Sequence, residues 1–177
     1  MARAHTHHRR SPQRPLGLAS TPTREALVRA LTGGRAHTSL VEALRKFPRS
    51  LCARKPRGAP HTPWELLEHL RIAQRDILDF SRDPEHTSPA WPAGFWPPSA
   101  TPPDARAWAR SVKALQADLR TLVAIARDPK IDLAATIPGT TTTWLAQLLL
   151  VASHGSYHLG QLLFLRRTLE ASAGRRR

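Results

Sequence analysis

The sequence predicts an all-α protein, a bundle of four main helices. Apolar residues recur at spacings of three and four along four segments, as they do on the buried face of a helix. The 16 prolines fall between those segments, and no stretch shows the alternation of a convincing strand. A chain of 177 residues is long enough to form one domain with a sizeable core. We therefore expect a helical bundle with stiff connections.

The first helix is expected to be broken in two. Thr21-Pro22 places a capping residue before a proline at the first helical position. A stripe of apolar residues follows, and Gly33-Gly34 should interrupt it. A second half, Thr38 to Phe47, continues the stripe until Pro48 ends it.

The second helix has the clearest start signal in the chain. Thr62 to Glu65 has the sequence TPWE, a capping box with proline at the first helical position. We expect the helix to run from Pro63 to Phe80, with apolar residues on one face and His69 on or beside that face.

A long loop rich in proline and tryptophan, Ser81 to Pro103, separates the second helix from the third. It holds seven prolines together with Trp91, Phe95 and Trp96. Disordered linkers rarely carry so much aromatic surface, so we expect an ordered loop over one end of the core. Its aromatic rings either plug the bundle or wall a substrate pocket, and the two interpretations are compatible. The third helix is expected from Asp104 to Arg127.

The last helix carries the most informative pattern. Thr143 is a plausible cap, and the apolar stretch runs from Trp144 to Arg167. Within it, His154 and His158 lie four residues apart on one helical face, so two imidazoles could converge on one metal ion. The uninterrupted apolar run at its start is too short to cross a bilayer, and we expect no membrane partner.

The net charge of +14 is concentrated at the two ends of the chain. We expect a basic, disordered arm over residues 1–20, the helical domain over 21–170 and a basic tail over 171–177. Nonspecific electrostatic binding of nucleic acid through these ends is an alternative function. No helix-turn-helix or zinc-finger signature accompanies them, so we do not expect a nucleic-acid partner.

One cysteine, Cys52, cannot form an internal disulfide, which favours a reducing compartment. The basic arm lacks the apolar region of a signal peptide, so a cytoplasmic location is expected. Cys52 lies among Arg54, Lys55 and Arg57, which could lower the pKa of its thiol. We interpret it as an inert surface thiol.

The three histidines His69, His154 and His158 form a candidate metal site. Neutral imidazoles buried together without a shared metal would each need a separate hydrogen-bond partner. From the pattern alone, a metal site and a set of satisfied core histidines are about equally favoured. Gly155 stands where a zincin HExxH motif has its glutamate base, which argues against a zinc protease. Three ligands would leave a coordination position open, as in reactive sites.

Three segments resemble the DinB-like metalloprotein family, in particular a bacterial subgroup ending in a YHLGQ helix. They are Trp64 to Gln74, the FWPP segment that starts at Phe95, and His154 to Gln161, which reads HGSYHLGQ. The resemblance covers about residues 25–169. It implies a four-helix bundle of up-down-down-up topology with a three-histidine site for nickel or zinc. By position match, the ligands it implies are His69, His154 and His158.

The resemblance also implies a reaction class. Relatives include thiol-dependent transferases and isomerases that present a low-molecular-weight thiol to the metal, so a small-molecule thiol is the implied partner. A metal-dependent transferase or hydrolase is the resulting hypothesis. The family pattern has an aspartate before the first histidine of the pair and often an asparagine after it, where this chain has Ser153 and Gly155. A non-catalytic metal- or ligand-binding bundle is therefore the alternative.

No catalytic residue can be assigned from the sequence, but two polar neighbours of His158 are candidates. Gln161 lies about one turn beyond His158 and could hydrogen-bond a metal-bound water. Tyr157 is adjacent in sequence. Structural packing of Tyr157 and a surface role for Gln161 are the alternatives. A homodimer is compatible with a small helical bundle, although no separate interface pattern is visible.

Overall fold

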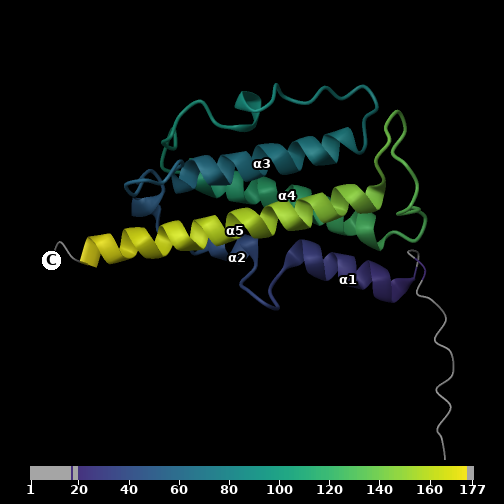
Figure 1. Cartoon of the computed structure of the whole chain (residues 1–177), viewed down its shortest axis with the longest axis horizontal. Helices are drawn as coiled ribbons and strands as arrows, with labels where there is room; N and C mark the ends of the chain where they lie inside the picture. Colours follow the sequence, from purple (N-terminus) through teal and green to yellow (C-terminus); the bar gives the residue numbers. More distant parts are fainter. Residues whose placement is uncertain (1–16, 18–19, 175–177) are drawn as a thin grey trace, which may run out of the picture.

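The computed structural model describes Gly17 and residues 20–174, and every regular element in these residues is a helix (Figure 1). Within this part of the chain, extended pairing is limited to an isolated bridge between Thr136 and Thr143. The all-α class is thus confirmed, whereas the up-down-down-up order stays a prediction. The predicted arm lies almost wholly outside the described residues. The elements are α1 (Thr21–Thr32), α2 (Leu40–Arg45), η1 (Arg49–Leu51), α3 (Pro63–Phe80), η2 (Ala93–Phe95), α4 (Ala107–Arg127) and α5 (Trp144–Gly174).

The predicted break in the first helix separates α1 from α2. Gly33 and Gly34 have φ angles of 67° and 87°, a region that glycine enters without the steric cost that a Cβ atom imposes. The cap of α1 is one residue earlier than expected. Ser20 Oγ, not Thr21, accepts a hydrogen bond from the backbone N–H of Thr23 at 3.4 Å.

Helix α3 has the predicted bounds because its capping box forms. Thr62 Oγ1 accepts from the backbone N–H of Glu65 at 3.2 Å, and Glu65 Oε2 accepts from that of Thr62 at 2.7 Å. Helix α4 begins three residues later than expected, at Ala107. Asp104 instead forms an ion pair with Arg110 at 2.6 Å in the turn before the helix.

The connection between α3 and α4 runs back along α3 (Figure 1). Three hydrogen bonds hold it there: His86 to Asp76 near the end of α3, His69 to the carbonyl of Phe95 in its middle, and Thr62 to the carbonyl of Ala100 at its start. The loop is ordered, as expected, but it follows the side of α3 and does not cover an end of the core.

The apolar core consists of two clusters. One lies around α2, the first half of α3 and the end of α5, and the other around α1, the second half of α3 and the start of α5. On α5, Leu148 and Val151 belong to one cluster and Leu162 to the other. His154 and His158 therefore lie between the two apolar clusters along this helix.

Helix α5 is long and apolar enough to span a membrane by length and composition, and no other helix of the described residues is. A core helix of a bundle meets the same criteria. Helix α5 packs against α1, α2 and α3, which fits a bundle helix. Several large apolar side chains on its outer face are nevertheless exposed. They are Leu149, Leu150, Tyr157 and Phe164.

A buried arginine joins α1 to the end of α4. Arg24 of α1 is 5% exposed; its guanidinium donates to the carbonyl of Ala126 at 3.0 Å and to that of Ile131 at 2.6 Å. Ala126 lies in the last turn of α4, where a cation is favoured by the unpaired carbonyls and the helix dipole. Arg24 thus fixes α1 against the end of α4.

The sequence-based interpretation of Cys52 is wrong in one respect. The side chain is buried, only 3% exposed, and belongs to the core cluster around α2. Burial raises the pKa of the Cys52 thiol to about 11, and the opposing effect of Arg49 is smaller. The thiol is therefore protonated and shielded at neutral pH, which agrees with an inert role but not with a surface position.

Candidate metal centre

Helices α3 and α5 bring the three predicted histidines together. His69 projects from α3, while His154 and His158 project from consecutive turns of α5. One ring nitrogen from each lies within 4.8 Å of the others. Nε2 of His69 and Nε2 of His154 are 3.0 Å apart. The convergence that the sequence predicts for these three side chains is present.

Two of the three rings are oriented by hydrogen bonds on the side away from the cluster. His69 Nδ1 lies 2.9 Å from the carbonyl oxygen of Phe95, and His158 Nδ1 lies 2.7 Å from Oε1 of Gln161. Because both oxygens can only accept, each Nδ1 carries the hydrogen and donates it. Nε2 of each ring is then left with its lone pair available to a ligand-binding site.

An aromatic side chain from the long loop covers one side of His69. Trp96 stacks on His69 with ring centroids 4.1 Å apart and planes 9° from parallel. Trp96 also stacks on His61, with centroids 3.8 Å apart and planes 16° from parallel. Trp91, in contrast, is 77% exposed and meets the ring of Phe95 edge-on. One of the three loop aromatics therefore walls the site with its ring, and Phe95 contributes through its backbone.

The pKa values of all three histidines are lowered, and burial is the main cause in each. For His154 the pKa falls to about 4, because burial acts together with the charges of His158 and His69. The pKa values of His69 and His158 are lowered in the same direction, against the opposing effects of their hydrogen bonds to Phe95 and Gln161. The three rings are thus neutral at pH 7, the state that binds a metal ion.

The two positions that depart from the family pattern have neighbours other than the histidine rings. Ser153 is exposed, and its hydroxyl donates to the carbonyl of Leu150. A Cβ atom at Gly155 would lie 3.6 Å from Leu40 of α2. Gln161, one of the two candidates named from the sequence, orients His158 and also donates to the hydroxyl of Tyr157 at 3.2 Å.

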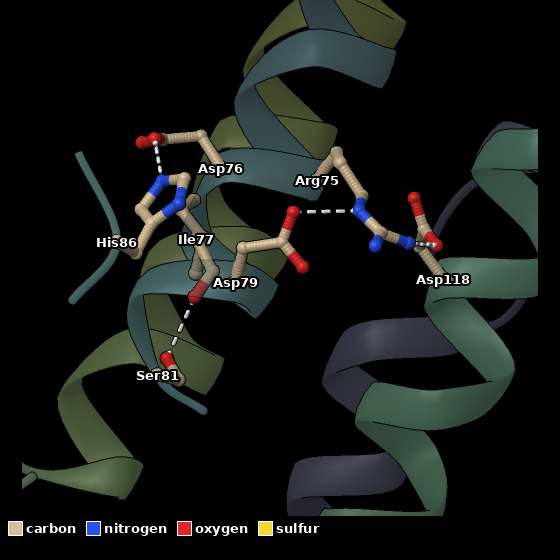
Figure 2. A network of polar contacts seen from close by, with 7 residues as sticks. All are labelled: Arg75, Asp76, Ile77, Asp79, Ser81, His86 and Asp118. Atoms are coloured by element: carbon tan, nitrogen blue, oxygen red, sulfur yellow. Dashed lines mark hydrogen bonds and ion pairs between the residues drawn. The ribbon is translucent and has the colours of Figure 1, made fainter. Parts of the chain in front are cut away.

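His86, a histidine outside this group, has different surroundings (Figure 2). His86, in the long loop, pairs with Asp76 of α3 at 2.8 Å. Close by, Arg75 pairs with Asp79 at 2.7 Å and with Asp118 of α4 at 3.2 Å. Acidic partners surround this cluster, whereas the candidate metal group consists, among the described residues, of histidines alone.

The fold and the site together make this protein a helical bundle with three converging, neutral imidazoles. The sequence matches the DinB superfamily over residues 33–162, so the chain belongs to the DinB superfamily. No curated protein and no solved structure matches it. The matched range includes all three histidines. Family and geometry together are compatible with metal binding.

Sequence reasoning missed the groups that support the site. His61 directly precedes the capping threonine of α3, and nothing in the local pattern marks it as a neighbour of His69 through Trp96. The Phe95 carbonyl is a backbone group and has no sequence signal of its own. The loop aromatics indicated a wall but not which ring would form it.

Proposed function

We propose that this protein binds a divalent transition-metal ion, nickel or zinc, through Nε2 of His69, His154 and His158. The observation that carries the proposal is the convergence of three ring nitrogens from two helices within 4.8 Å. The donor set fits, because neutral imidazole suits both metals. Nitrogens bound to one ion at about 2.0–2.1 Å lie roughly 3–3.5 Å apart, and the nearest pair here is already 3.0 Å apart.

The residues around the cluster support such a site. The Phe95 carbonyl and Gln161 fix the ring orientations of His69 and His158, which is what supporting groups do for metal-bound histidines. Trp96 covers the outer face of His69 and excludes water from that side. Three protein ligands would leave at least one coordination position open for a small molecule.

We infer that the reaction class is metal-dependent transfer or hydrolysis, with a low-molecular-weight thiol as co-substrate. When bound, the ion would act as a Lewis acid that polarises a water or thiol at the open position. Membership of the DinB superfamily supports this inference, together with the three-ligand arrangement. A cytoplasmic location would suit it, since reducing conditions keep thiols in their reactive form.

A non-catalytic metal- or ligand-binding bundle is the second candidate. One observation favours it: among the described residues, the histidine group contains no carboxylate that could move a proton. Under this alternative, metal would raise the melting temperature, but no external thiol would enter the coordination sphere.

The decisive experiment is metal content by elemental mass spectrometry on the untagged chain. His5, His7 and His8 lie in the arm and are replaced by alanine in every sample to remove adventitious binding. We expect about one equivalent per chain. Each of His69→Ala, His154→Ala and His158→Ala should lose it, whereas His86→Ala, the matched control, should retain it.

Two results would separate the outcomes. Full metal content in all three single variants would refute the ligand assignment. With cobalt(II) in the site, a sulfur-to-metal charge-transfer band on addition of a small thiol would support the transferase proposal. Its absence at saturating thiol would favour the non-catalytic bundle.

A further inference from the structure

A pocket of about 420 Å³ lies between the loop of residues 56–61 and the end of α5. Most of its surface is apolar. Leu66 of α3 and Leu165 of α5 are buried beside it, and Phe164 is 70% exposed at its edge. The volume falls within the range of about 300–1,000 Å³ that is typical of small-molecule sites.

Arg57 brings a positive charge to this apolar pocket. Among the described residues that line the pocket, it is the one with a permanent charge, and none of them is acidic. Within the described part of the chain, its guanidinium has no ion-pair or hydrogen-bond partner. An apolar cavity with one free arginine is complementary to an anion that has an apolar body.

Two residues that line the pocket also contact the histidine cluster or the tryptophan that covers it. Gln161 lines the pocket, and its Oε1 accepts the hydrogen bond from His158. His61 also lines the pocket and stacks on Trp96, which in turn stacks on His69. A molecule in the pocket would therefore lie against the residues that support the candidate metal ligands.

We propose that this pocket binds small monocarboxylates with an apolar body, such as medium-chain aliphatic or aryl carboxylates. The carboxylate pairs with Arg57, and the apolar body packs against Leu66, Phe164 and Leu165. One guanidinium provides one bidentate face for a carboxylate, and no second arginine or lysine lines the described pocket to neutralise a dianion. The role of this ligand as a substrate rests on the proposed metal site; its binding does not.

The test is calorimetric titration of the metal-free full chain with octanoate, with octan-1-ol as the uncharged analogue and octyl phosphate as the dianionic one. We expect octanoate to bind at least about fivefold more tightly than octan-1-ol and no less tightly than octyl phosphate. Arg57→Gln should weaken octanoate binding about five- to tenfold and leave octan-1-ol unchanged. Arg54→Gln, an exposed neighbour outside the pocket lining, is the matched control and should have no effect.

A second pair of variants locates the ligand. Phe164→Ala should weaken octanoate and octan-1-ol by the same factor, about three- to tenfold. Leu149→Ala removes an exposed apolar side chain from the same helix, away from the pocket, and should change neither affinity. Octanoate affinity that is unchanged in both Arg57→Gln and Phe164→Ala would overturn the proposal, as would tighter binding of octyl phosphate.

The failure of this proposal can be told apart from failure of the metal site. Octanoate binding that persists in His69→Ala, together with loss of metal, would support the pocket independently of the ion. A chain that holds metal but binds no octanoate would overturn the pocket proposal and leave the metal site standing.

Discussion

Helix α3 contributes to two polar clusters that use histidine in opposite ways. His69 lies in the first, and two turns further on, Asp76 holds His86 in the second. In the first cluster two rings donate Nδ1–H to neutral oxygens and turn Nε2 toward the other histidines. In the second cluster Nε2 of His86 is already occupied by a carboxylate. Surroundings, not residue type, therefore decide which histidines can bind a metal.

The second cluster, formed by Arg75, Asp76, Asp79, His86 and Asp118 and called the acidic cluster, has a structural role. The pair of His86 and Asp76 attaches the long loop to the end of α3, while Arg75 links α3 to Asp118 of α4 (Figure 2). These contacts stabilise the arrangement of the elements and leave no convergent lone pairs. They offer a matched control for each test of the histidine cluster.

Among changes that leave the three histidines in place, the largest effect is expected from removing the oxygen that orients His158. Gln161→Leu should lower metal affinity about 10- to 100-fold, because loss of such a supporting hydrogen bond frees the ring to rotate. Gln161→Glu keeps an acceptor and should stay close to wild type. Competition with a chelating dye measures both affinities.

Tyr157→Phe is the control for Gln161, because it removes only the hydroxyl that Gln161 Nε2 contacts. We expect metal affinity within about threefold of wild type. Unchanged affinity in Gln161→Leu would show that this hydrogen bond does not position His158.

The next-largest effect is expected in how the free energy of unfolding of the metal-free protein depends on pH. His154 has a pKa of about 4 when folded, against an ordinary value of 6.5, so the unfolded chain binds the additional proton between these values. The free energy of unfolding should therefore fall as pH drops from about 6.5 towards 4. His154 should account for about 1–2 kcal/mol of this loss, after allowance for its partial exposure.

Urea unfolding at pH 7, 6 and 5 measures this dependence. In His154→Leu the decrease over this range should be smaller, since one proton-binding group of the unfolded state is gone. His69 and His158 shift in the same direction and leave part of the slope. If the free energy of unfolding fell equally with pH in wild type and variant, His154 would not be the source of the pH dependence.

The smallest effect is expected in the acidic cluster. His86→Ala breaks the partly buried pair with Asp76 and should cost about 0.5–1 kcal/mol in the free energy of unfolding. Metal affinity should not change, because His86 does not belong to the converging group. A loss of metal affinity in this variant would show that the two clusters are coupled through the loop.

Local signals in the sequence predicted helix α3 best. Its capping box is a short-range motif, so Thr62 and Glu65 fix the start without help from the rest of the fold. The start of α1 shifted by one residue because Ser20 and Thr21 are both good caps. The start of α4 shifted by three because Asp104 lies in the turn before the helix, where it pairs with Arg110 of α4.

The histidines could be predicted because helical periodicity places them on the buried faces of two helices. The groups that orient and cover their rings could not be predicted. The contact of His69 with Phe95 spans 26 residues through a proline-rich loop without periodicity, and stacking on Trp96 depends on the path of that loop. The burial of Cys52 was missed because its sequence neighbours are charged, whereas tertiary packing turns its side chain into the core.

The buried arginine of α1 has a consequence for the order in which the chain is assembled during synthesis. Arg24 bonds to carbonyls 102 and 107 residues further along, and α1 packs against α4 and α5. As translation proceeds, α1 emerges before α3 and α4, but the carbonyl partners of Arg24 are absent until Ala126 and Ile131 have been made. Helix α1 can thus be fixed in place by Arg24 only after the end of α4 has been synthesised.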